Sequence, residues 1–144
     1  MWTIGHGAGS FADLERRIAP FGISILVDVR SKPSSRNAPD FTRRDLEVLA
    51  EEASIGYRWM GATLGGTPDD GVVGVERPGF EESIEELIEL AESTPTVILC
   101  SELSPDACHR ATIVGAALDQ RGIEVEHILG DGSIRRHERA LPFS

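Results

Sequence analysis

Residues 96–129, TVILCSELSPDACHRATIVGAALDQRGIEVEHIL, carry the clearest indication of the fold class. The stretch opens on a short apolar, β-branched run at residues 96–99, which is typical of a buried strand. Ser104-Pro105 is a good N-cap and first-turn pair for the helix that follows, and Gly122 ends that helix. A second apolar run occupies residues 123–129. A strand, a helix and a second strand in this order predict two parallel strands joined by a right-handed crossover.

The same alternation of strands and helices extends through the rest of the chain. Further strands are expected at Trp2–Ile4, Ile23–Val29 and Tyr57–Met60. Amphipathic helices are expected between Ser10 and Gly22, between Thr42 and Gly56, over residues 80–91, and from Ser104 to Arg121. The tail beyond Asp131 is expected to be irregular. This order predicts a single α/β domain over residues 1–144, a three-layer domain with a mainly parallel five-stranded sheet and helices on both faces.

Length and composition agree with one globular domain. The chain has 144 residues, of which 40% are apolar and 26% charged, as is ordinary for such a domain. No apolar run approaches the ~20 residues that cross a bilayer, and the first four residues lack the basic start of a signal peptide. Two cysteines are too few for a disulfide framework. We therefore expect a cytoplasmic protein without a membrane partner.

Charge is distributed unevenly along the chain. The formal net charge of −10 argues against nucleic-acid binding by bulk charge. Residues 30–45 nevertheless hold five basic and two acidic side chains, whereas glutamates concentrate in residues 76–92. The basic segment predicts either an anion-binding site or a solvated loop, and charge alone leaves both interpretations open.

Polar residues that could bind a ligand or take part in catalysis follow the strands, whereas the connections that lead into strands are short. His6 follows the first strand, Arg30–Arg36 the second, Gly65-Gly66 the third, Cys100–Glu102 the fourth, and Asp131 the fifth. In open α/β sheets, ligands bind beyond the carboxyl ends of the strands. We therefore expect these residues to converge on one edge of the sheet.

Cys100 is the candidate nucleophile. The helix after it would present its amide groups and positive dipole end to the thiol, which lowers a thiol pKa and binds anions. The alternative is a packed thiol, since free cysteine is among the most buried residue types. Glu102, His109 and Asp28 are the candidate proton carriers. Asp28 and Arg30 share a strand face, so they could instead form a purely structural ion pair.

The other candidates would bind an anionic substrate. They are His6, Arg30, Ser35, Arg36, Gly65, Gly66, Arg110 and Asp131. His6 has the alternative of being a buried core histidine. A zinc site is disfavoured because seven residues separate Cys100 from Cys108, which fits no familiar spacing of zinc ligands. The glycine pairs complete no nucleotide-binding motif, and we expect neither a metal nor a cofactor.

Several motifs resemble a known family. They are TIGH at Thr3–His6, DVRSxPxSR at Asp28–Arg36, PxF at Pro39–Phe41, LGG at Leu64–Gly66, CxExxPxxCHR at Cys100–Arg110 and HILxDG at His127–Gly132. Through them the chain resembles, over nearly its whole length, the bacterial and archaeal family known as domain of unknown function 488. The resemblance implies a small α/β domain and brings no established activity. A distant likeness is to rhodanese domains, although nine residues separate Cys100 from Arg110, too many for their tight loop.

These observations predict an enzyme with an anion-binding, cysteine-containing pocket at the carboxyl ends of the strands. Its substrate would be small and phosphate-, sulfur- or nucleotide-like. The alternative is a non-catalytic module that binds nucleic acid or nucleotide phosphate through the arginine-rich loop and the basic tail at residues 135–139. A third interpretation is a protein-interaction domain that uses the glutamate-rich helix.

Overall fold

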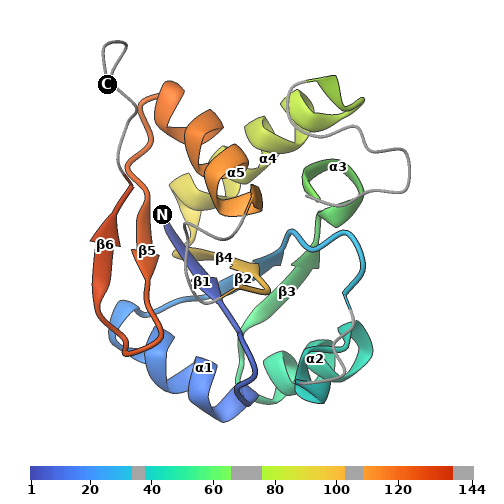
Figure 1. Cartoon of the computed structure of the whole chain (residues 1–144), viewed down its shortest axis with the longest axis vertical. Coiled ribbons are helices and arrows are strands. Elements are labelled where there is room, and N and C mark those ends of the chain that lie inside the picture. The colour runs from blue at the N-terminus through green and yellow to red at the C-terminus, as the bar shows by residue number, and fades with distance from the viewer. Residues whose placement is uncertain (34–37, 66–75, 103–108, 138–144) are drawn as a thin grey trace.

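The protein is organised around a six-stranded sheet with the strand order β3-β2-β4-β1-β5-β6 (Figure 1). The computed structural model describes residues 1–33, 38–65, 76–102 and 109–137. The strands are β1 (Trp2–Gly5), β2 (Ile25–Asp28), β3 (Gly56–Trp59), β4 (Thr96–Cys100), β5 (Glu126–Ile128) and β6 (Ile134–Arg136). Strands β1 to β5 are parallel, and β6 pairs with β5 in the antiparallel sense. The predicted α/β class is confirmed, with six strands in place of five.

Helices cover both faces of the sheet. The helices are α1 (Phe11–Ile18), α2 (Arg43–Glu52), α3 (Gly61–Leu64), α4 (Phe80–Ser93) and α5 (His109–Gln120). Figure 1 shows α1 and α2 on one face and α4 and α5 on the other. The single turn α3 follows β3 directly. The result is the three-layer arrangement that alternating strands and helices favour.

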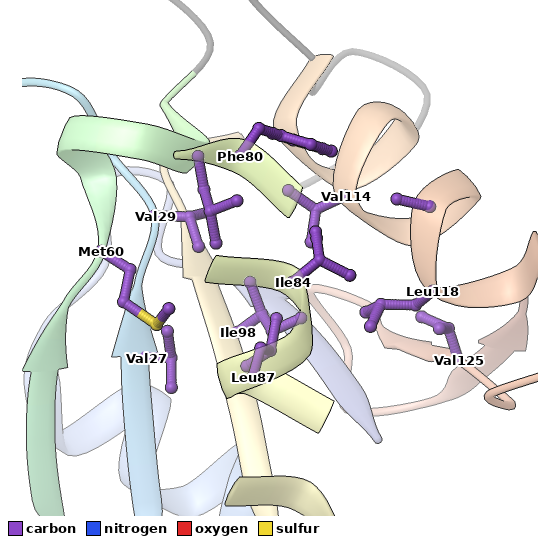
Figure 2. Packing of buried hydrophobic residues seen from close by; sticks show 12 residues of the cluster. Val27, Val29, Met60, Phe80, Ile84, Leu87, Ile98, Val114, Leu118 and Val125 are labelled. Carbon is purple, nitrogen blue, oxygen red and sulfur yellow. The ribbon is translucent and has the colours of Figure 1, made fainter. Parts of the chain in front are cut away.

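Alternate residues of each strand feed the two sides of the core. On the α4/α5 face, Val27 and Ile98 pack with Ile84 of α4 (Figure 2). On the α1/α2 face, Leu26 packs with Leu14 of α1. Burying one such side chain stabilises the fold by about 1.5–3 kcal/mol. Burial on both faces explains why the central strands are apolar runs instead of alternating patterns.

The predicted signals at the ends of two helices are confirmed. Ser10 caps α1, because its Oγ accepts a hydrogen bond of 3.2 Å from the backbone N–H of Asp13. Gly22 and Gly122 have φ angles of 61° and 78°, in the left-handed region where the chain turns toward the next strand. Glycine adopts that region without steric cost, which makes it an effective helix stop.

The predicted helix stop at Gly56 is wrong. Helix α2 ends at Glu52, and Gly56 is already the first residue of β3. The left-handed residue is Ser54, with φ 59°. The N–H of Ile55 donates to the carbonyl oxygen of Ala50 at 2.8 Å, which is the bond that closes a Schellman turn. A serine thus takes the position that the pattern assigns to glycine.

The chain beyond Asp131 forms a strand, which corrects the expectation of an irregular tail. Asp131 Oδ1 accepts hydrogen bonds from the N–H (2.9 Å) and the hydroxyl (2.6 Å) of Ser133, and Gly132 has φ 88°. The N–H of Leu129 donates to the Ser133 carbonyl oxygen at 2.8 Å. This tight turn folds β6 back onto β5. All three residues of β6 are exposed, so the strand lacks the apolar alternation that would have revealed it.

Other boundaries differ by small amounts. Strand β3 begins one residue before the predicted start, β5 lies in the second half of its predicted range, and the single turn α3 is not predicted. The predicted N-cap Ser104 lies outside the described residues. In the described part of the chain, no helix is both long and apolar enough to cross a membrane.

Candidate functional site

The carboxyl ends of β1 and β4 are the point where the chain leaves the sheet in opposite directions. These two strands are neighbours at the centre of the sheet. After β1 the chain passes through α1 to β2, and after β4 it passes through α5 to β5, on the other side. Helices α1 and α5 also lie on opposite faces (Figure 1). Such a topological switch point is where open α/β sheets bind their ligands.

Backbone pairing continues for two residues beyond β1 and one residue beyond β4. The N–H of His6 donates to the carbonyl oxygen of Cys100 at 3.0 Å, and the N–H of Gly7 donates to that of Ser101 at 2.8 Å. Gly7 has φ 57°, a left-handed conformation that turns the chain away from the sheet. The two connections therefore diverge after Gly7 and Ser101.

A buried ion pair closes β2 next to this point. The Nε and Nη2 groups of Arg30 donate to the two carboxylate oxygens of Asp28, each at 2.8 Å, and the backbone N–H of Arg30 adds a bond of 3.1 Å. Asp28 is fully buried and Arg30 is 2% exposed. The prediction that both side chains share a strand face is confirmed. Because both oxygens of Asp28 accept bonds from Arg30, the pair is compact and electrically neutral.

Two aromatic residues of β3 donate hydrogen bonds to Asp28 and Arg30. The Tyr57 hydroxyl donates to Asp28 Oδ2 at 2.6 Å. Burial of this hydroxyl, and then the adjacent Asp28 carboxylate, raise the pKa of Tyr57. Trp59 Nε1–H donates to the carbonyl oxygen of Arg30 at 2.8 Å, and the Arg43 guanidinium lies 4.6 Å from the centre of the Trp59 ring. The sequence does not reveal either aromatic as a neighbour of Asp28 and Arg30, because the pairing of β3 with β2 is a tertiary contact.

His6 links the ion pair to the switch point. Its Nδ1 lies 2.6 Å from the carbonyl oxygen of Gly7, which only accepts, so Nδ1 carries the proton. Its Nε2 lies 3.3 Å from Nη1 of Arg30 and therefore accepts. The ring stacks on Phe41 with 4.4 Å between centres and is 3% exposed. The hydrogen bonds thus assign His6 a neutral tautomer, with both nitrogens engaged.

Cys100 lies on the other face of the sheet from Arg30. Leu99 belongs to the cluster that packs against α1 and α2, whereas Ile98 belongs to the cluster under α4 and α5. Alternation places the Cys100 side chain with Ile98. Cys100 is 4% exposed, and its Sγ lies 3.6 Å from the carbonyl oxygen of Glu102. Arg30 and Cys100 therefore approach the switch point from opposite faces.

Two glycines after β3, Gly61 and Gly65, let the single turn α3 approach the end of β2. A Cβ atom at Gly61 would lie 1.8 Å from the carbonyl oxygen of Arg30, and one at Gly65 would lie 2.0 Å from Oγ of Ser31. No side chain fits at either position without a backbone shift. Gly65, a predicted binding residue, therefore has a packing requirement of its own at the carboxyl edge.

Of the remaining predicted site residues, the structure describes only Glu102 and Asp131 with their side chains. Glu102 is exposed beyond β4. Asp131 lies in the β5–β6 turn, where the hydrogen bonds from Ser133 lower its pKa. The side chains of His109 and Arg110, in the first turn of α5, lie outside the described part, as do Ser35, Arg36, Gly66 and Cys108. Within the described residues, no three His, Cys, Asp or Glu side chains gather as a metal site would require.

A family model matches the segment that carries Asp28, Arg30 and Tyr57. Residues 12–71 match Domain of unknown function DUF488. The family expected from the motifs is therefore confirmed over this segment. The DUF488 match covers α1 to α3 and ends before Cys100. The likeness to rhodanese domains stays a prediction. No curated protein and no solved structure matches the chain.

Proposed function

We propose that the protein is a cytoplasmic enzyme that binds a small anionic substrate beyond the carboxyl ends of β1 and β4. The substrate class is phosphate-, sulfur- or nucleotide-like, and Cys100 is the reactive thiol. The observation that carries the proposal is the position of Cys100, which ends the central strand β4 at the switch point of the sheet. The chain then leads into α5, whose amino-terminal end favours negative charge.

The residues around this thiol divide into positioning and binding groups. Asp28 neutralises Arg30, so this pair, with His6, serves to hold the ends of β2 and β1 in place. The positive charge for the substrate comes from Arg110 at the start of α5, with Arg36 from the basic segment. Glu102, exposed next to Cys100, and His109 are left as the proton carriers.

Alkylation of Cys100 as a function of pH tests the proposal. The folded Cys108→Ser protein is treated with iodoacetamide so that Cys100 is the single thiol, and the double variant Cys100→Ser/Cys108→Ser, which has no thiol, supplies the blank. An activated thiol reacts with a midpoint below the ordinary value of about 8.5. Inorganic phosphate or sulfate should slow the reaction relative to chloride at equal ionic strength, because an anion bound beside the thiol shields it.

Two outcomes contradict the proposal. One is a thiol that reacts only above about pH 8.5, or that does not react at all in the folded protein. The other is a reaction rate that phosphate and sulfate leave at the chloride value. Either result would assign Cys100 to packing, in line with its burial.

A second candidate function rests on the open edge of the sheet. Strand β6 is exposed along its whole length and carries Arg135 and Arg136. These side chains suit a nucleic-acid backbone, whose binding weakens steeply as salt displaces the phosphate contacts. Fluorescence anisotropy of a labelled single-stranded oligonucleotide between 50 and 200 mM salt, roughly the range in which such contacts are lost, tests it. Absent or salt-independent binding removes this candidate.

A further inference from the structure

A second polar cluster connects β1 with β5, on the side of β1 that faces away from β4. His127 of β5 is 5% exposed, and its Nδ1 lies 2.6 Å from Oγ1 of Thr3 in β1. Its Nε2 lies 3.1 Å from Nδ1 of His137, and the two ring centres are 5.3 Å apart. His137 directly follows β6. The contact between the two rings therefore ties the end of β6 to the buried part of the sheet.

His137 is held in place by its backbone and by a glycine. Its N–H donates to the carbonyl oxygen of Val125 at 2.9 Å. A Cβ atom at Gly115 of α5 would lie 3.1 Å from Cε1 and Nδ1 of the His137 ring, closer than side chains normally pack. The ring therefore rests against α5 at a position where glycine leaves room for it.

Only one proton fits between the two facing nitrogens, Nε2 of His127 and Nδ1 of His137. At 3.1 Å one nitrogen donates its N–H and the other accepts through its lone pair. If both facing nitrogens carried protons, the hydrogen bond would be lost and two positive rings would repel each other. The pair is therefore compatible with a charge of zero or one, and a second charge breaks it.

We propose that the contact between His127 and His137 is an acid-sensitive latch, which holds β6 against β5 and α5 near neutral pH and releases it on acidification. Release would leave β5 as the last strand of the sheet. Its uncovered N–H and C=O groups would then be open to pairing with another strand. The protonation of two histidines would thus decide which strand forms this edge.

Each element packed against the latch contributes charged groups. By element, they are the Met1 α-amino group before β1, Glu124 and Glu126 at β5, Arg135 and Arg136 in β6, and Asp119 in α5. The Met1 amine donates to the Glu124 carbonyl oxygen at 3.1 Å, and its burial lowers its pKa. Acid adds protons to amines and imidazoles alike, so the amine is a second source of pH dependence at this edge of the sheet. The test must therefore separate the histidines from the amine.

Amide hydrogen exchange of the full chain at pH 7.5 and 5.0 measures the latch directly. Protection factors remove the intrinsic pH dependence of exchange. A histidine that stays neutral in the latched state, but protonates in the released state with an ordinary pKa of about 6.5, weakens the latch about 30-fold over this range. We expect protection of the His137 amide to fall by about 30-fold, while amides of the central strand β4 keep theirs.

The variant His137→Asn separates the latch from the amine. An asparagine amide presents either its oxygen or its NH2 group to His127, so it tolerates both protonation states of that ring. The pH-dependent loss of protection should shrink below about 3-fold in this variant. Arg136→Gln, an exposed change in the same strand, should behave like the wild type. A wild-type change below about 3-fold, or equal changes in the wild type and His137→Asn, would overturn the proposal.

Discussion

Replacing Asp28 by asparagine would leave the Arg30 guanidinium buried without its countercharge. Asparagine keeps one oxygen, which can still accept from the backbone N–H and Nε of Arg30. Its NH2 group takes the place of the oxygen that accepts from Arg30 Nη2 and from the Tyr57 hydroxyl. The NH2 group and Nη2 of Arg30 are then two donors that face each other in a buried site, whereas the Tyr57 hydroxyl can turn and accept from the NH2 group. The two side chains have nearly the same shape, so the loss is electrostatic and not a packing defect.

The geometry sets the size of this loss. The hydrogen bond from Arg30 Nη2 is lost and the bonds that remain lose their charged acceptor; one bond to a charged group is worth about 1.5–3 kcal/mol. Removing one partner of a buried ion pair costs about 3–5 kcal/mol, because the remaining charge stays uncompensated. We expect the free energy of unfolding to fall by about 3–5 kcal/mol. A domain has only about 5–15 kcal/mol in total, so the change is large.

Urea unfolding followed by far-ultraviolet circular dichroism measures this change as a lower midpoint at an unchanged slope. The matched control is Glu47→Gln, which removes the exposed ion pair between Glu47 and Arg43. The side chains of that pair are 48% and 46% exposed, and its removal should cost about 0.5 kcal/mol or less. Adding Arg30→Met to Asp28→Asn should restore part of the stability, since it removes the uncompensated charge.

Two results would refute this reasoning. A loss below about 1 kcal/mol for Asp28→Asn would mean that water or another group compensates Arg30. A double variant less stable than Asp28→Asn alone would mean that the guanidinium contributes by packing and not by its pairing with Asp28.

Two further predictions concern the neighbours of this ion pair. Tyr57 is the single tyrosine of the chain, so phenolate absorbance near 295 nm reports on it alone. Since burial and Asp28 raise its pKa, the folded protein should show no phenolate at pH 10–11, about the ordinary tyrosine value. The unfolded state loses this proton first, so the contribution of Tyr57 to the free energy of unfolding is complete below about pH 10 and falls above it. A midpoint of about 10 for phenolate formation in the folded protein would contradict this. Gly61→Ala should destabilise by more than about 2 kcal/mol in thermal melts, because its Cβ would displace the Arg30 carbonyl. The exposed neighbouring change Ala62→Ser should stay within about 0.5 kcal/mol, and equal melting temperatures for both variants would disprove the packing argument.

Much of the fold follows from local patterns, and the exceptions have local causes. The apolar run before Asp28 predicts a strand, and the alternation of side chains along it predicts that Asp28 and Arg30 share a face, as they do. Strand β6 was missed because its side chains are exposed and only its backbone pairs. The stop after α2 was misassigned because Ser54 adopts a conformation usually left to glycine.

The candidate site was harder to predict than the fold, because its members come from different strands. Order along the chain does not reveal that β4 lies between β2 and β1. This position brings Arg30, Cys100 and His6 to one end of the sheet. The pairing of β3 with β2 in turn brings Tyr57 to Asp28. These contacts depend on strand register, which is fixed by the packing of whole elements.

Local patterns predict strands β1 to β5, helices α1, α2, α4 and α5 and the apolar faces of these elements, because periodicity and capping act between residues a few positions apart. The order of residues also shows that polar side chains follow the strands. The approach of Arg30 and Cys100 to the switch point from opposite faces, and the contact of Asp28 with both Arg30 and Tyr57, depend on tertiary structure. Tertiary structure alone also brings His127 against His137. The physical reason is that strand order and register minimise the free energy of the whole core, to which every element contributes, and no local segment encodes that sum.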